Sequence, residues 1–95
     1  MIINYEDLPK IRQKHAGQKI VMLKGTFDLF HLGHLNMVKR AKALGDVLVV
    51  LVKCDRAIKL KGPDRPIESE DQRAAIVDAI RYVNYTLIAD RLTDV

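Results

Sequence analysis

Short apolar runs alternate with amphipathic segments along this chain, and the alternation predicts strands and helices in turn. Residues 19–24 and 47–52 are short runs rich in branched apolar residues, and the second contains no polar residue. Such runs are typical of strands buried on both faces of a parallel sheet. Residues 85–89 predict a third strand of the same kind.

Apolar residues at helical spacing occupy the segment before the first of these strands. Residues 5–16 place Leu8 and Ile11 on one stripe, and Gly17 is suited to end the helix. Pro9 fits only in the first turn, where its missing N–H costs no hydrogen bond.

A second helix is predicted between the two long apolar runs, with Gly45 ending it as a left-handed cap. Leu35, Val38 and Ala41 follow its helical spacing, and Lys42 with Leu44 extend the same stripe. Strand, helix and strand then fit within residues 19–53 as a βαβ unit. Its two strands should be parallel and its crossover right-handed.

The next segment, residues 54–68, is charged and interrupted by glycine and proline, so it predicts a loop with one short helical turn near residues 56–59. Ser69 and Gln72 have the spacing of a capping box and predict the start of another helix. Its predicted buried stripe is Ala75, Ile76, Ala79, Ile80 and Val83. The pattern as a whole predicts an α/β fold with an open parallel sheet.

Composition restricts the class of protein further. The 95 residues suit one domain over 1–95, and 48% apolar with 29% charged residues indicates a globular fold. Lys and Arg number 16 against 12 Asp and Glu, a net charge of +4 that suits polyanionic small molecules. With only 5% aromatic residues there is little to stack on bases, so we expect no nucleic-acid partner.

Membrane insertion and disulfide chemistry are not expected. The longest apolar run, Val47 to Val52, is too short to span a bilayer, and residues 1–7 lack the pattern of a signal peptide. Cys54 is the single cysteine, which agrees with a reducing compartment. We therefore expect a cytoplasmic protein without a membrane partner.

Candidate chemistry is concentrated in residues 25–34, Gly-Thr-Phe-Asp-Leu-Phe-His-Leu-Gly-His. His31 and His34 are three apart at a predicted helix start, so they project from one face beside unpaired backbone N–H groups. Gly25 and Gly33 allow close backbone approach. The helix dipole and the two imidazoles favour an anion, so this corner predicts a phosphate site.

Other chemistry-bearing residues should lie at the same edge of the sheet, because parallel sheets bind ligands beyond the carboxyl ends of their strands. Asp55, Lys59 and Lys61 follow the second strand. Asp28 is suited either to cap the helix or to order substrate or a metal, and the two roles are compatible. A metal site from His31, His34 and Cys54 lacks the usual ligand spacing and a fourth donor, so none is expected.

The motif Gly25-Thr26-Phe27-Asp28 with His31-Leu32-Gly33-His34 resembles the signature of the HxGH nucleotidyltransferases, in their cytidylyltransferase-like branch. That branch includes glycerol-3-phosphate and ethanolamine-phosphate cytidylyltransferases, archaeal FAD synthetase and the adenylyltransferase domain of ADP-heptose synthesis. Further matches follow in family order at residues 43–46, 61–67, 72–73 and 79–83. The resemblance implies a Rossmann-like α/β/α sandwich.

The implied activity is transfer of an NMP group from CTP or ATP to a phosphorylated small molecule, such as a polyol phosphate, a sugar phosphate or a cofactor precursor, with release of pyrophosphate. Mg²⁺ is expected with the nucleoside triphosphate. The implied catalytic residues are His31, His34 and Lys61. The implied nucleotide-binding residues are Gly25, Thr26, Phe27, Asp28, Gly33 and Asp55. Arg73 and Arg81 match positions linked to phosphate binding or a dimer contact, and a homodimer is expected.

The resemblance ends near the C-terminus. Residues 90–95 do not match the Arg and Ser/Thr-rich element with which family members also hold the nucleotide. The expected domain is therefore truncated or shortened, and the alternative function is a catalytically incomplete nucleotide-binding or dimerisation module. An RNA-binding basic domain is a third hypothesis. Nothing in the sequence decides between ATP and CTP, although the loop at 61–66 looks more like the ADP-heptose branch.

Overall fold

The computed structural model describes residues 1–60 and 62–91, and in it four parallel strands form one sheet in the order β1-β4-β3-β2. The strands are β1 (Ile2–Ile3), β2 (Ile20–Gly25), β3 (Val47–Lys53) and β4 (Tyr85–Ala89). The helices are α1 (Leu8–Lys14), α2 (Leu32–Lys42), α3 (Asp55–Lys59) and α4 (Glu70–Asp78), and a 3₁₀ turn at Tyr5–Asp7 precedes α1. The predicted open parallel sheet is confirmed. β1 was not predicted, because two residues show no periodicity.

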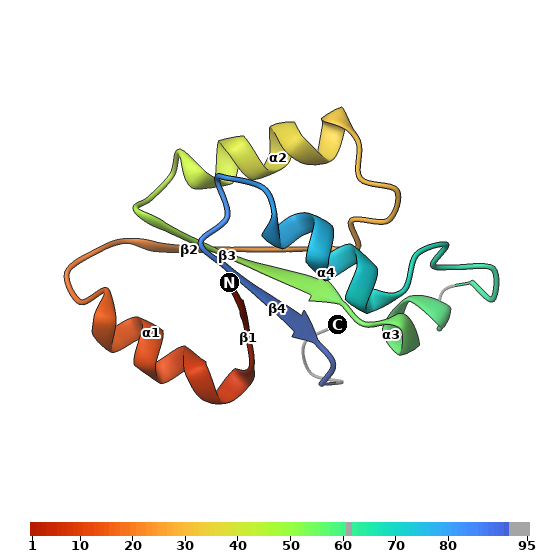
Figure 1. Cartoon of the computed structure of the whole chain (residues 1–95), viewed down its shortest axis with the longest axis horizontal. Coiled ribbons are helices and arrows are strands. Elements are labelled where there is room, and N and C mark those ends of the chain that lie inside the picture. The colour runs from red at the N-terminus through yellow and green to blue at the C-terminus, as the bar shows by residue number, and fades with distance from the viewer. Residues whose placement is uncertain (61, 92–95) are drawn as a thin grey trace.

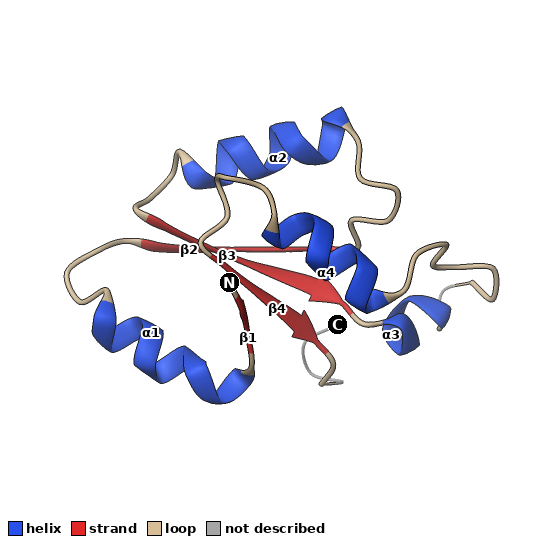
Figure 2. Cartoon of the chain, viewed as in Figure 1, coloured by secondary structure: helices blue, strands red, loops and turns tan. Residues whose placement is uncertain are grey.

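Helices cover both faces of the sheet, with α1 on one side and α2 and α4 on the other (Figures 1 and 2). β3 lies between β2 and β4, and its side chains enter both cores. Val47 and Val49 pack beside Ile11 of α1, whereas Leu48 and Val50 pack beneath α2 and α4. The expected α/β/α sandwich is therefore present.

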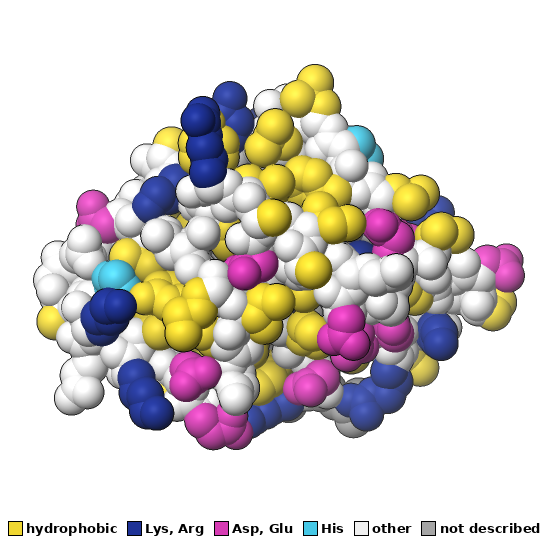
Figure 3. Space-filling view, viewed as in Figure 1, with side chains coloured by type: hydrophobic (Ala, Val, Ile, Leu, Met, Phe, Trp, Pro, Cys, Tyr) yellow, Lys and Arg dark blue, Asp and Glu magenta, His cyan; other side chains and the backbone are white. Residues whose placement is uncertain are grey.

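Helix ends follow the local chemistry of the sequence. The Ser69 hydroxyl accepts a hydrogen bond from the Gln72 N–H (3.2 Å), and the Gln72 side-chain oxygen accepts one from the Ser69 N–H (3.0 Å), which confirms the capping box at α4. Lys39, Arg40 and Lys42 occupy the last turn of α2, where positive charge complements the helix dipole. Figure 3 shows basic side chains gathered over that end of α2.

The predicted apolar stripe of α4 was partly wrong: Ile80 and Val83, which follow the helix, do pack in the core, but the helix itself buries a different face. Arg73, Ala74 and Val77 are the buried residues of this helix, and Ala75 and Ile76 are exposed. A charged residue takes a core position here, so the apolar spacing alone selected the wrong face. Likewise Leu44, predicted on the stripe of α2, is 63% exposed because α2 ends before it.

Gly45 does not have the predicted left-handed conformation, which the structure shows at Gly17 (φ 83°). It is required for a different reason. A Cβ at Gly45 would lie 2.7 Å from Val21 Cγ2 and 2.8 Å from the Lys19 carbonyl oxygen. That carbonyl accepts hydrogen bonds from Asp46 and Val47, so the backbone cannot easily give way.

Replacing Gly45 by Ala should destabilise the fold by about 1–3 kcal/mol, because the new methyl group overlaps the β2 entry. Chemical denaturation measures the effect. Gly62→Ala is the matched control, since nothing lies within 4 Å of its Cβ position, and its unfolding free energy should change by less than about 1 kcal/mol. Equal stability of the two variants would contradict the steric role of Gly45.

Among the described residues, no helix has the length and apolar character needed to cross a bilayer.

Candidate functional site

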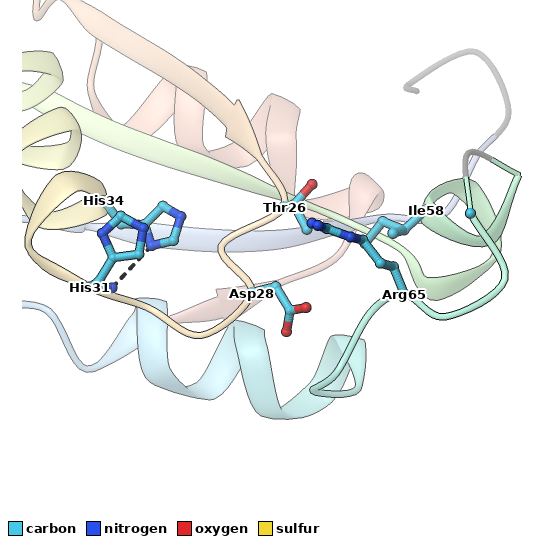
Figure 4. A pocket seen from close by; sticks show the side chains of 7 residues that line it. Thr26, Asp28, His31, His34, Ile58 and Arg65 are labelled. Carbon is cyan, nitrogen blue, oxygen red and sulfur yellow. Dashed lines mark hydrogen bonds between the residues drawn. The ribbon is translucent and has the colours of Figure 1, made fainter.

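A pocket of about 500 Å³ opens where the chain leaves β2 and β3, at the edge of the sheet predicted to bind ligand (Figure 4). It is lined by Thr26, Asp28, His31, His34, Ile58, Gly62 and Arg65. These residues come from the β2–α2 turn, from the first turn of α2, from α3 and from the segment before α4. The structure thus brings together four of the predicted site residues, Thr26, Asp28, His31 and His34.

The two histidines are fixed by backbone hydrogen bonds at the start of α2. His31 is the N-cap residue, and its Nδ1 accepts from the Gly33 N–H (3.0 Å). His34 Nδ1 accepts in turn from the His31 N–H (3.1 Å), so the pair forms a reciprocal cap. The ring centroids lie 4.0 Å apart. Because both Nδ1 atoms accept, each neutral ring carries its hydrogen on Nε2 and donates from there.

The electrostatic environment favours the neutral form of His34. Burial lowers its pKa below the usual 6.5, the nearby His31 lowers it further, and Asp28 partly opposes the shift. The reciprocal cap acts in the same direction, because a proton on Nδ1 would displace the His31 N–H. His34 is therefore built to present an N–H donor rather than a fixed imidazolium charge.

Two predicted glycines are closely approached by neighbouring side chains. A Cβ at Gly33 would lie 2.7 Å from the His31 ring, and one at Gly25 would lie 2.9 Å from the Phe27 ring. Phe27 itself is buried in the core, where its ring meets the His34 ring edge-on at 5.7 Å. A close approach at both glycines was predicted. In the structure the approaching groups are the rings of His31 and Phe27, and neither glycine lines the pocket.

Asp28 does not cap α2, because His31 occupies that position. Its carboxylate instead accepts hydrogen bonds from the Ile67 N–H (2.8 Å) and the Glu68 N–H (2.9 Å). Burial raises its pKa, but these two bonds and the charges of Arg73 and Arg65 more than offset that, so the pKa of Asp28 lies below the usual 3.8. An ionised Asp28 thus fixes the segment before α4 against the turn.

Arg73 and Asp55 form an ion pair, which corrects the role predicted for Arg73, whereas the nucleotide contact of Asp55 stays a prediction. Arg73 is 0% exposed, and Asp55 does not line the pocket. The guanidinium donates to the carbonyls of Glu68, Thr26 and Lys53 at 2.8–3.0 Å and to the Asp55 carboxylate at 2.7 Å. Contact with phosphate or a partner subunit would require a surface that Arg73 does not have.

Arg81 lies away from the pocket, in the connection that leads into the start of β4. It donates to the Tyr82 hydroxyl (2.9 Å) and its guanidinium lies 5.0 Å from that ring. A phosphate contact at the histidine pocket is therefore excluded by position. Its part in a dimer contact stays a prediction, and Lys61 falls outside the described residues.

Sequence reasoning missed two residues that contribute here. Arg65 lines the pocket, and Glu68 accepts a hydrogen bond from the Leu29 N–H (2.8 Å). Both lie in the charged segment that was predicted only as a loop. The Arg65-Pro66 pair after Gly62-Pro63 could have indicated that Arg65 belongs to the site. No local sequence pattern indicates the role of Glu68.

No group of three potential metal ligands occurs among residues 1–60 and 62–91. Cys54 is buried at the N-cap of α3 and does not line the pocket with the histidines. For the part of the chain that the structure describes, the geometry offers donors for an anion rather than a cage for a cation.

A parallel α/β sheet covered by helices on both faces, with a pocket at the carboxyl ends of its strands, defines the Rossmann-like class of protein. Comparison with known families then gives a narrower assignment. The cytidylyltransferase-like family matches residues 22–93, and the chain belongs to this family. The resemblance inferred from the histidine motif is thereby confirmed.

Two relatives illustrate the similarity. The chain is 40% identical over 89 residues to "Bifunctional protein HldE" of Campylobacter concisus, covering 93% of this chain and 19% of that protein. It is 42% identical over 83 residues to the protein of the same name from Helicobacter pylori, covering 86% and 18%. The chain thus spans about a fifth of the length of these relatives.

A solved structure supports the same fold. The lipopolysaccharide core biosynthesis protein from Thermoplasma volcanium superposes with a TM-score of 0.74 at 35% identity. The match covers 81% of this chain and 65% of that one.

Removing the His31 ring should raise the pKa of His34. His31→Ala both exposes His34 and removes the neighbouring imidazole, and each of these effects lowers the pKa in the wild type. An NMR titration of the His34 imidazole measures the shift. Asn36→Ala, an exposed change on the same helix, should leave the titration unaltered. An unchanged or lower His34 pKa in His31→Ala would refute the proposed coupling.

Proposed function

We propose that this chain carries the triphosphate site of a nucleotidyltransferase that moves an NMP group from ATP or CTP to a sugar phosphate. The observation that carries the proposal is the reciprocal cap of His31 and His34. It leaves two Nε2–H donors on rings that line one pocket, beside the positive end of α2. Arg65 adds a full charge to the same pocket.

These groups suit a reaction in which negative charge moves between oxygens. A phosphate oxygen of the acceptor attacks the α-phosphorus of the triphosphate, the bond to the bridging oxygen breaks, and pyrophosphate leaves with that electron pair. No covalent enzyme intermediate is required. The protein must position two anions and stabilise charge on the bridging oxygen, and prearranged N–H donors do so without reorganisation.

Mg²⁺ is proposed to arrive with the triphosphate. Asp28 is a carboxylate of the described pocket, but its two oxygens already accept backbone hydrogen bonds. The ion's ligands should therefore be mainly triphosphate oxygens and water, in keeping with the reluctance of Mg²⁺ to lose its hydration shell. When bound, it would neutralise part of the triphosphate charge.

The sugar-phosphate assignment is supported by the relatives and by the loop at 61–66, which resembles that of the ADP-heptose branch. On that basis we favour a heptose phosphate acceptor and ATP as donor, with CTP as the competitor in the test. The protein is further proposed to act as a homodimer.

A nucleotide-binding module without turnover is the second candidate. It is favoured by the lining of the pocket, which over the described residues contains donors for phosphate but no Phe, Tyr or Trp side chain to stack on a base, so that only part of a nucleotide site is present there. Calorimetry with ATP and CTP, run beside a pyrophosphate-release assay, separates the two functions. Binding without release would support the module.

His34→Ala should lower the rate of pyrophosphate release by about 10²- to 10³-fold, because it removes one donor to the developing charge. His31→Ala should cost at least as much, since it also removes the helix cap. Steady-state kinetics with ATP or CTP and candidate sugar phosphates measure both. Asn36→Ala serves as the control on the same helix. Undiminished turnover in His34→Ala would contradict the assigned mechanism.

The lowered pKa of His34 predicts the direction of the pH dependence. Protonation of Nδ1 breaks the hydrogen bond from the His31 N–H that holds the His34 ring in place, so the contribution of the positioned ring is complete above the ordinary pKa of 6.5 and is lost as pH falls through the lowered pKa. We therefore expect kcat/KM to stay level as pH rises from about 6.5 to 8 and to fall below that range. A decline on the alkaline side with the midpoint of the His34 titration would instead indicate an imidazolium acid.

A further inference from the structure

The turn that presents the histidines has an unfavourable backbone. Phe27 (φ 56°) and Leu29 (φ 49°) both lie in the left-handed region, which is disfavoured for residues with a side chain. Such a turn persists only where its surroundings determine it. Leu29 is 57% exposed, so core packing cannot hold its side of the turn.

Hydrogen bonds from the segment before α4 hold this turn in place. The Glu68 carboxylate accepts from the Leu29 N–H (2.8 Å), and the Asp28 carboxylate accepts from the Glu68 N–H (2.9 Å). Each of the two acidic residues therefore binds the backbone of the other's segment. Bonds from a carboxylate to N–H groups are charge-assisted and stronger than neutral ones.

The buried Arg73 side chain also links the turn to the segment before α4. Its guanidinium donates to the Thr26 carbonyl (2.8 Å) at the start of the turn and to the Glu68 carbonyl (3.0 Å). The β2–α2 turn and the segment before α4 are thus joined both by the acidic side chains and by the buried guanidinium group. Arg65, three residues before Glu68, lines the pocket from this segment.

We propose that Glu68 is a positioning residue, which keeps the left-handed turn in the conformation that presents His31 and His34 to a triphosphate. This inference rests on the proposed function of the histidine pair. Glu68 acts through the Leu29 N–H and is not itself among the residues that line the pocket. It also joins the turn to the segment that carries Arg65.

The test compares Glu68→Ala, Glu68→Gln and Glu70→Ala. Glu70 is a matched control, because its carboxylate also accepts a backbone hydrogen bond, from the Asp55 N–H (2.9 Å), but does not contact the turn. Hydrogen exchange of the Leu29 amide, followed by NMR in the protein alone, should accelerate at least about 10-fold in Glu68→Ala. Glu68→Gln retains an acceptor oxygen and should exchange nearly as slowly as wild type.

Binding of inorganic triphosphate, followed by the imidazole resonances of His31 and His34, reports on positioning without requiring turnover. Glu68→Ala should bind about 10-fold more weakly, with Glu68→Gln and Glu70→Ala near wild type. Where turnover is measurable, Glu68→Ala should lower kcat, and Glu68→Gln should restore most of it.

The outcomes separate the inference from the proposed function. If the Leu29 amide exchanges in Glu68→Ala at the wild-type rate, Glu68 does not hold the turn, whatever the activity of the variant. Faster exchange with unaltered triphosphate affinity overturns the positioning role. If wild type itself releases no pyrophosphate from ATP or CTP, the proposed function fails, while the exchange and triphosphate measurements still decide the role of Glu68.

Discussion

The burial of one guanidinium group is the constraint on which this site depends. A charge removed from water is tolerated only where it is paired and hydrogen-bonded, and Arg73 meets that condition through groups at the β2–α2 turn, the end of β3, the start of α3 and the segment before α4. Three of the four acceptors are backbone carbonyls. The pairing therefore specifies where the main chain must run, and the pocket inherits its shape from that requirement.

Much of the fold could be predicted because it is encoded in local periodicity. The branched apolar run at 47–52 and the capping box at Ser69 each have one favoured structural solution, and both were found where the pattern placed them. Prediction failed where tertiary context decided the outcome. Arg73 occupies a core position that a charge would normally avoid, and Gly45 is needed for a close approach between distant segments rather than for its own conformation.

The candidate site divides in the same way. Thr26, Asp28, His31 and His34 could be predicted because they lie within residues 26–34: the spacing of the two histidines at a helix start has a direct chemical meaning, and the resemblance to a known motif added Thr26. Glu68 could not, since it acts on the Leu29 backbone across a separation of 39 residues, and a backbone partner leaves no trace in the sequence. Neither Arg73 nor Asp55 could be distinguished from a surface residue until their ion pair was seen.

The reciprocal cap of the two histidines has a consequence for ion selectivity. Histidine binds transition metals through a ring-nitrogen lone pair, and here the Nδ1 lone pair of each ring is already directed at a backbone N–H. Nε2 then carries hydrogen, and freeing it for a metal would require protonating Nδ1 and giving up the cap. The Nδ1 lone pairs that a His-x-x-His pair could offer to zinc are in this way occupied by the first turn of a helix, and the Nε2–H groups that remain are hydrogen-bond donors.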